Sequence, residues 1–162
     1  MRGTRVTWLI CVGALALPAT VRAQEPGPGD REGVMAVVNA LFDAMRAADS
    51  VAVRALFHTE LRRMATSGER DGAPAVMFGD LDGFARAVGS AQPGEMDERL
   101  GPAEVRIDDH LATVFTPYAF YYKGQLSHCG VNVFQVARAG SEWKIVGLAD
   151  TRRREGCEEW LK

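Results

Sequence analysis

Long apolar runs are scarce in this 162-residue sequence, and their scarcity excludes a bundle of membrane helices. The longest, Trp8–Leu17, covers about ten residues, whereas a helix needs about 20 to cross a bilayer. Histidine and cysteine are also rare, with three of each. The histidines show neither H-x-H nor H-x3-H spacing, so we predict no metal centre.

Familiar catalytic motifs are missing as well. The sequence has no G-x-S-x-G nucleophile motif, no phosphate-binding loop and no dinucleotide fingerprint. Gly68, Gly72 and Gly79 are scattered loop glycines. We therefore predict no cofactor, and no motif names a reaction.

The first 23 residues have the pattern of a signal peptide. Arg2 and Arg5 form a positive segment, Trp8–Leu17 forms an apolar one, and residues 21–23 fit the small-x-small cleavage rule. We predict cleavage after Ala23 and a periplasmic or secreted protein with no membrane attachment afterwards. An uncleaved anchor and a misassigned start are the alternatives.

The predicted mature chain has 139 residues, enough for one domain with a real core. Residues 1–23 hold three arginines and no acidic residue, so 16 basic residues remain against 21 acidic ones. A mildly acidic domain is a poor candidate for binding nucleic acid. The one basic run, residues 152–154, is followed at once by Glu155, which indicates a solvated strand end.

Helical spacing dominates the first part of the domain. We expect residues 24–29 to be a flexible lead, residues 30–157 to be the folded domain and residues 158–162 to be a tail. Apolar residues form one continuous stripe from Val34 to Met45, and Asp30 is a candidate N-cap.

The next segments are shorter. Asp49 and Ser50 are expected to end the first helix and cap a second one, residues 51–57. Residues 61–66 predict a short strand and residues 67–74 a polar loop. Asp80 is a candidate N-cap for a third helix that ends at Gly89, and residues 98–100 are an ambiguous strand.

Period-2 alternation begins near Ala103. Three apolar-rich runs between His110 and Cys157 are separated by Lys123-Gly124 and by residues 138–141, the pattern of an antiparallel meander. Helices followed by such a sheet indicate an α+β fold. We expect a cone-shaped barrel, made of a strongly curved antiparallel sheet wrapped around about three helices, with a pocket inside.

Strand parity predicts which side chains face the pocket. If Lys123-Gly124 is a two-residue turn, Ala119 pairs with His128. The His128 face then carries Leu111, Thr113, Phe115, Tyr121, Asn132, Phe134, Val136, Trp143, Ile145 and Thr151. The opposite face carries Tyr118, Phe120, Val131, Val133, Val146, Leu148, Asp150 and Arg152. A bulge at Pro117 would move Tyr118 to the His128 face, and this alternative stays open.

Taken together, the order of elements and several local motifs resemble the nuclear transport factor 2-like superfamily, and within it the exported SnoaL-like or lumazine-binding group. The residues that carry the resemblance are Ala48-Asp49-Ser50 before Leu56-Phe57, Pro117-Tyr118-x-Phe120, Ser127-His128-Cys129-Gly130, Phe134, Trp143-Lys144-Ile145 and Thr151–Cys157. The resemblance implies a cone with a cavity and often a dimer through the outer sheet face. It implies no particular activity. Both predicted sheet faces are apolar, which also favours a homodimer.

We expect a small hydrophobic or aromatic ligand in the cone. The predicted ligand-binding residues are Phe42, Phe115, Tyr118, Tyr121, His128, Asn132, Phe134 and Trp143. His128 is the candidate catalytic residue, because its ordinary pKa lies near neutral pH; a structural histidine is the alternative. A binding protein is our first hypothesis, since no acid–base pair is evident. An enzyme of the isomerase, dehydratase or cyclase type, with His128 as proton shuttle, and a self-assembling domain with a filled core are the others.

Two cysteines, Cys129 and Cys157, remain after the predicted cleavage. Cysteines in an exported domain usually pair, so we predict a disulfide; two free buried thiols are the alternative. Strand register places Cys157 well beyond the residue opposite Cys129. The tail would therefore have to turn back, and Gly156 would ease that turn.

Overall fold

The computed structural model describes residues 28–61 and 63–157, which fold into three helices and seven strands. The helices are α1 (Pro28–Arg46), α2 (Ser50–Leu56) and α3 (Leu81–Gly89). The strands are β1 (Met64–Arg70), β2 (Ala73–Gly79), β3 (Met96–Leu100), β4 (Glu104–Asp108), β5 (Leu111–Tyr122), β6 (Gln125–Ala139) and β7 (Glu142–Thr151). The predicted α+β class is confirmed. The predicted signal peptide, residues 24–27 of the predicted flexible lead and the predicted tail lie outside the described residues. Pro28 and Gly29, the last two residues of that lead, belong to α1.

The apolar stripe of α1 builds the core. All six of its predicted residues, from Val34 to Met45, are at most 7% exposed. Phe42 packs edge-on against Phe134 of β6, with ring centroids 6.0 Å apart. Asp30 is not the N-cap, because the helix already begins at Pro28, whose fixed φ suits a first helical turn.

The two short helices begin at the predicted caps. Asp49 accepts hydrogen bonds from the backbone N–H groups of Val51 and Ala52, at 3.0 and 2.8 Å. Asp80 accepts one from Gly83 at 2.6 Å. Each carboxylate satisfies N–H groups that a helix start leaves without a partner.

The β1–β2 hairpin contradicts the predicted polar loop over residues 67–74. The strands pair from Met64↔Gly79 to Arg70↔Ala73, and Asp71-Gly72 makes the turn with positive φ at both residues. Asp-Gly is a strong hairpin signal of this type, and it was available in the sequence.

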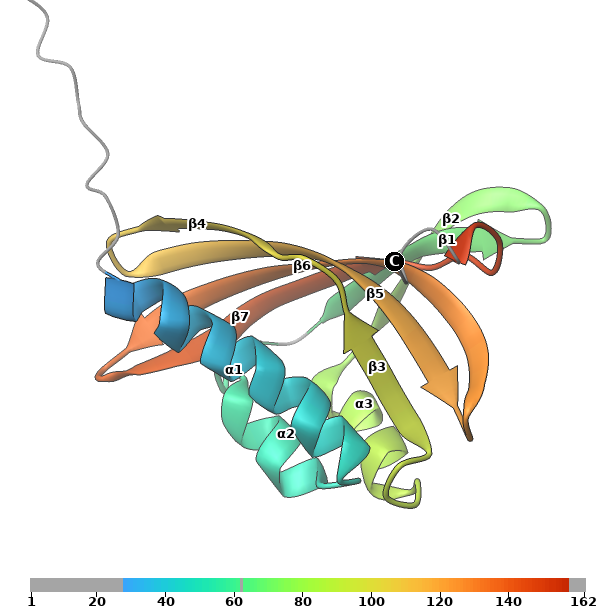
Figure 1. Ribbon diagram of the computed structural model, residues 1–162, viewed down its shortest axis with the longest axis horizontal. Helices are drawn as coiled ribbons and strands as arrows, with labels where there is room; N and C mark the ends of the chain where they lie inside the picture. The colour runs from blue at the N-terminus through green and yellow to red at the C-terminus, as the bar shows by residue number, and fades with distance from the viewer. Residues whose placement is uncertain (1–27, 62, 158–162) are drawn as a thin grey trace, which may run out of the picture.

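The strands form one sheet in the order β2-β1-β7-β6-β5-β3, and β4 also pairs with β5. All pairs are antiparallel except β1 with β7, so the sheet is mixed rather than wholly antiparallel. It curves strongly without closing into a barrel, and the helices lie together on its concave side (Figure 1). Among the described residues, no helix has the length and hydropathy needed to cross a membrane.

Two β-bulges decide which side chains face the helices. Ser127 is an extra residue in β6, inserted between the partners of Phe120 and Tyr121. The register shifts again in β7, where Val146 is the extra residue. Each bulge reverses the alternation beyond it, because side chains on a strand repeat every two residues.

The predicted parity is therefore wrong for β5 and for the second half of β7. The concave face carries Ala112, Val114, Thr116, Tyr118 and Phe120, then His128, Asn132, Phe134 and Val136, then Trp143, Ile145, Leu148 and Asp150. Leu111, Thr113, Phe115, Tyr121 and Thr151 lie on the convex face instead. The open alternative for Tyr118 holds, but the bulge lies at Ser127 rather than at Pro117.

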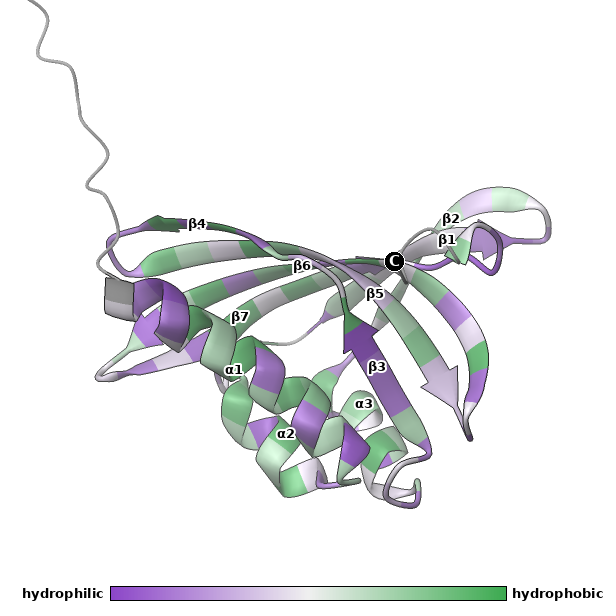
Figure 2. Ribbon diagram, in the orientation of Figure 1, coloured by the Kyte–Doolittle hydropathy of each residue, from purple (hydrophilic) through white to green (hydrophobic). Residues whose placement is uncertain are grey.

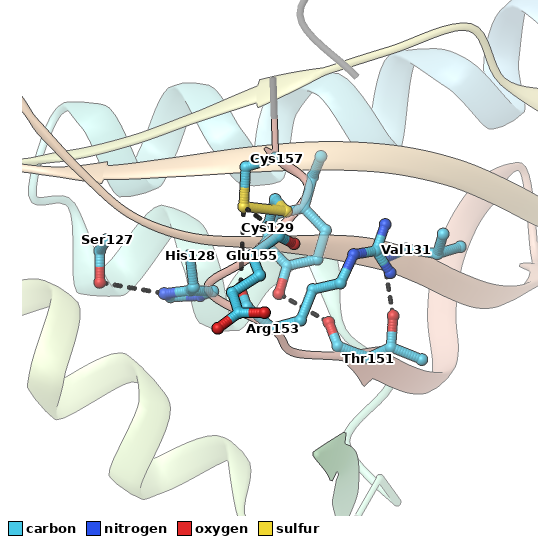
Figure 3. Close-up of a disulfide and its surroundings, with 9 residues drawn as sticks. Ser127, His128, Cys129, Val131, Thr151, Arg153, Glu155 and Cys157 are labelled. Atoms are coloured by element: carbon cyan, nitrogen blue, oxygen red, sulfur yellow. Dashed lines mark hydrogen bonds between the residues drawn. A yellow bond between two sulfur atoms is a disulfide. The ribbon is translucent and has the colours of Figure 1, made fainter. Parts of the chain in front are cut away.

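The predicted Cys129–Cys157 disulfide is present, with the Cα atoms 5.5 Å apart (Figure 3). Cys129 pairs with Arg153 in an isolated bridge beyond the end of β7. The chain then turns at Gly156, whose φ is positive, and brings Cys157 back to Cys129. The bond packs with Ala119 and Tyr121 in a small cluster away from the main core.

Candidate functional site

A row of polar side chains crosses the concave face. Thr66 pairs with Asp150, Asp150 with Asn132, and Asn132 with Thr116, so the row spans β1, β7, β6 and β5. Thr116 is fully buried, and its hydroxyl donates to the Gly101 carbonyl at 3.2 Å. Buried polar groups are costly unless they are satisfied, so a polar row through a core marks a candidate site.

A partly enclosed cavity of about 160 Å³ lies between this row and the helices. Its apolar wall comes from the core: Leu41, Phe42, Met45, Met64, Phe84, Phe134 and Leu148. Its polar wall consists of Thr66, Glu98, Tyr118, Asn132, Asp150 and Arg152. Gly79 and Arg152 are the exposed lining residues and mark its opening to solvent.

Glu98 is the most strongly perturbed acid of this cavity. Alternation along β3 turns Glu98 inward, while the neighbouring Asp97 is held outward by Arg46 and Arg99, at 3.0 and 2.9 Å. The Glu98 carboxyl is 9% exposed, and Oε1 accepts a 2.7 Å hydrogen bond from the Asn132 amide. Burial raises the pKa of Glu98 from 4.5 to about 7, although the Asn132 bond opposes the shift. Near neutral pH this carboxyl can therefore both give and accept a proton.

Asp150 anchors the other side of the polar wall. Its Oδ1 accepts a 2.6 Å hydrogen bond from the Thr66 hydroxyl, and its Oδ2 lies 3.3 Å from the Tyr118 hydroxyl. The Tyr118 hydroxyl makes its shorter bond, 2.9 Å, to the Thr151 carbonyl. Burial and the nearby Asp150 charge raise the pKa of Tyr118 above its usual range. Tyr118 therefore stays neutral under ordinary conditions.

Gly130 makes room for this arrangement. A Cβ at this position would lie 1.8 Å from the Thr151 carbonyl oxygen, the same oxygen that accepts the Tyr118 bond. A side chain at residue 130 would thus collide with backbone and displace the acceptor that holds Tyr118.

His128 lies beside the cavity and does not line it. The imidazole is 8% exposed and packs between the rings of Tyr118 and Phe120, with centroids 5.8 and 4.9 Å away. Nδ1 lies 3.1 Å from the Ser127 hydroxyl (Figure 3). Burial, with the charges of Arg152 and Arg154, lowers the pKa of His128 to about 4. The imidazole is neutral at physiological pH, and its surroundings fit a structural histidine.

The cavity brings together half of the predicted ligand-binding residues. Phe42, Tyr118, Asn132 and Phe134 line it. Phe115 is 48% exposed on the convex face, and Tyr121 lies on that face beneath Arg99. Trp143 is buried at the other end of the sheet and packs against Gly33 of α1. A Cβ atom added at Gly33 would lie 2.9 Å from the Trp143 ring.

Sequence reasoning missed Glu98, Thr66 and Phe84 and placed Asp150 on the wrong face. For Glu98 a signal existed. Met96, Glu98 and Leu100 share one face of β3, so a carboxyl interrupts an otherwise apolar face. Figure 2 shows β3 as hydrophilic over most of its length. Hydropathy alone therefore does not distinguish the inward Glu98 from the outward charged residues beside it. For Asp150 the unpredicted bulge in β7 was decisive.

Solved structures of the same architecture come from several bacteria. A protein of unknown function from Silicibacter pomeroyi superposes with a TM-score of 0.60 at 18% identity, over 77% of this chain and 97% of its own. A protein with a cystatin-like fold from Nostoc punctiforme gives 0.62 at 11% identity, over 82% and 97%. The chain has the NTF2-like fold.

A third NTF2-like structure, from Streptomyces avermitilis, is described as a candidate dehydratase. It matches at a TM-score of 0.58 and 17% identity, over 77% of this chain and 96% of its own. The sequence matches no protein-family model and no curated protein. The NTF2-like resemblance predicted from sequence is confirmed at the level of the fold, and the SnoaL-like or lumazine-binding subgroup stays a prediction. Among the described residues, no group of His, Cys, Asp and Glu has a metal-binding arrangement.

Proposed function

We propose that this protein binds a small, largely apolar or aromatic molecule in the cone, with the polar part of the ligand against Glu98 and Asn132. The supporting observation is the cavity of about 160 Å³, apolar on one wall and bearing a buried carboxyl–amide pair on the other. Ligand sites commonly combine apolar walls with a few convergent polar groups. A cavity of about 150 Å³ holds a benzene molecule, so a ligand with a single ring fits.

We propose further that the protein is exported, with cleavage after Ala23, and that it acts as a homodimer. The leader pattern in residues 1–23 supports export. Leu111, Phe115 and Val133 are 53%, 48% and 38% exposed on adjacent strands of the convex face. A second copy of the chain on this face would remove their apolar surface from water.

The binding proposal can be tested with single-ring probes and a cavity-filling variant. Thermal unfolding is followed with millimolar benzylamine, benzyl alcohol and benzoate, since a ligand that binds only the folded state raises the melting temperature. Leu148→Trp should abolish the rise by filling the cavity, and Leu148→Met is the volume-conserving control. No rise with any of the three probes, or a rise that survives Leu148→Trp, would refute binding in the cone.

A second candidate function is proton-transfer catalysis of the isomerase, dehydratase or cyclase type, with Glu98 rather than His128 as the proton carrier. The observation that favours it is the pKa of Glu98, which is raised by burial to about 7 and so suits a general acid or base near neutral pH. Glu98 lines the cavity, whereas His128 does not.

This candidate has its own test. Hydrogen–deuterium exchange at the carbon next to the carbonyl of cyclohexanone, followed by NMR in D₂O, reports proton abstraction without a known substrate. Wild type should accelerate the exchange over buffer, Glu98→Gln should not, and His128→Gln should retain the acceleration. Equal rates for wild type and Glu98→Gln would remove this candidate and leave the binding proposal intact.

A further inference from the structure

The hydroxyl hydrogens at the polar wall are already used within the protein. Among the described residues, the hydroxyl groups that line the cavity belong to Thr66 and Tyr118. The first donates to Asp150 at 2.6 Å and the second to the Thr151 carbonyl at 2.9 Å. Each hydroxyl carries only one hydrogen. A ligand that needs donors from these hydroxyls would therefore have to break an existing bond.

Acceptors outnumber donors on the inner wall, because the Asn132 amide has two N–H hydrogens and its bond to Glu98 uses one of them. Among the described residues, Asn132 bonds only Oε1 of Glu98, and Asp150 Oδ2 lies 3.3 Å from the Tyr118 hydroxyl and 3.9 Å from the Arg152 guanidinium. A carboxylate offers about four lone-pair sites, so both acids can accept further hydrogen bonds. The polar wall therefore suits a ligand that donates hydrogen bonds.

The charges of the wall point the same way. Two carboxyl groups, Glu98 and Asp150, line the cavity, and Arg152 is the cation among the lining residues. Arg152 is half-exposed at the opening, and its guanidinium lies 3.9 Å from Asp150, so solvent weakens its contribution. When both carboxyls are ionised, the inner part of the cavity is electronegative.

Aromatic rings complete the surroundings. Phe42, Phe84, Phe134 and Tyr118 line the same space, and the face of an aromatic ring attracts a cation. From the unused acceptors, the paired carboxyls and these rings together, we propose that the ligand of this cavity is a small primary amine. Its ammonium group lies between Glu98 and Asp150, and its apolar part contacts the phenylalanines. This inference rests on the proposed binding function, because it names the ligand class of the same site.

Three probes of one shape and different charge test the inference. Dissociation constants of benzylamine, benzyl alcohol and benzoate are measured by calorimetry near pH 8 with the oxidised protein. We expect benzylamine to bind at least about tenfold more tightly than benzyl alcohol, because two carboxylates and the rings favour a cation. Benzoate should show no detectable binding. Glu98→Gln should weaken benzylamine about tenfold and leave benzyl alcohol nearly unchanged.

The pH dependence on wild type needs no variant. An ammonium group favours the ionised carboxylate, and Glu98 ionises around pH 7, while an alkyl amine stays protonated up to about pH 9. Benzylamine should therefore bind about tenfold more tightly near pH 8 than near pH 6, and Glu98→Gln should remove most of this change.

The outcomes separate the two proposals. Tighter binding of benzyl alcohol or benzoate than of benzylamine would overturn the amine inference and leave the binding function standing. Benzylamine affinity that does not change between these pH values, or that survives Glu98→Gln unaltered, would also overturn it. No binding of any probe would overturn both. Leu148→Trp, with Leu148→Met as control, verifies that a bound probe occupies the cavity.

Discussion

Glu98 and His128 should give the folding stability opposite pH dependences. Both side chains are buried, at 9% and 8% exposure, and burial disfavours the charged form of each. For the acid the pKa rises from 4.5 to about 7, and for the histidine it falls from 6.5 to about 4. Each shift corresponds to about 3 kcal/mol of folding free energy at one end of the pH range.

The sign for Glu98 follows from proton uptake. Its folded pKa lies above its unfolded value, so the folded state binds the proton more tightly. This contribution is fully present below about pH 4.5 and is lost as the pH rises through about 7. Glu98→Gln removes the titration. Relative to wild type, this variant should therefore gain about 3 kcal/mol of unfolding free energy between pH ~4.5 and pH ~8.

For His128 the sign is reversed. Its folded pKa lies below its unfolded value, so the contribution is fully present above about pH 6.5 and is lost as the pH falls toward about 4. His128→Gln should lose about 3 kcal/mol relative to wild type as the pH rises over that window. In wild type the two contributions change the unfolding free energy in opposite directions and nearly cancel between pH ~4.5 and pH ~6.5. Glu98→Gln therefore reveals the titration of His128, and His128→Gln reveals that of Glu98.

Guanidinium denaturation at a series of pH values, with the disulfide intact, measures these free energies. Glu104→Gln on the exposed strand β4 is the matched control, and its curve should run parallel to that of wild type. If the Glu98→Gln curve also ran parallel to wild type, the carboxyl would not be buried as described. If both variants shifted in the same direction, burial could not be the common cause.

Three further predictions concern the supports of the site and the convex face. Replacing Cys129 and Cys157 by serine should cost roughly 3.5 kcal/mol of stability, because the bond closes a 28-residue loop; unchanged denaturation midpoints with and without reductant would contradict this. Gly130→Ala should destabilise by about 3 kcal/mol, since its Cβ meets the Thr151 backbone, whereas Gly29→Ala, with nothing within 4 Å, should be neutral or stabilising in thermal unfolding. Phe115→Asp should convert the proposed dimer to monomer in sedimentation or light-scattering measurements, and a variant that sediments like wild type would argue against the convex face as the interface.

Patterns within single elements were the predictable part of this fold. The stripe from Val34 to Met45, the caps at Asp49 and Asp80 and the Lys123-Gly124 turn all follow from local rules, and the structure confirms each. The prediction of which side chains face the helices was wrong for β5 and the second half of β7. It assumed uninterrupted alternation, whereas Ser127 and Val146 are extra residues that reverse it. A bulge adds one residue without a strong sequence signature, and one residue is enough to exchange the two faces of a strand.

The candidate site was the less predictable part for the same reason. Phe42 was found through the apolar stripe of α1. Asn132 and Phe134 keep their predicted face because β6 has no extra residue between them and His128. Asp150 was predicted on the convex face because the extra residue Val146 was not foreseen. Tyr121 was predicted on the cavity face because the extra residue Ser127 was not foreseen. For Glu98 the alternation of Met96, Glu98 and Leu100 covers only five residues, so the sequence signal is weak. The hydrogen bond to Asn132 depends on strand pairing that the sequence alone does not give.

The energetic cost of burying Glu98 bears on the proposed role of this polar wall. A carboxyl held in the core lowers stability at neutral pH by about 3 kcal/mol relative to a group that does not ionise. Its partner Asn132, 5% exposed, brings a second polar group into the same core. Replacing both partners of a buried hydrogen bond by apolar groups of the same shape can be nearly neutral or stabilising, so packing alone does not require this pair. Among the described residues, Asn132 bonds only Oε1 of Glu98. We therefore expect this pair to serve the proposed ligand rather than packing alone, and the Glu98→Gln titration described above tests the burial on which this expectation depends.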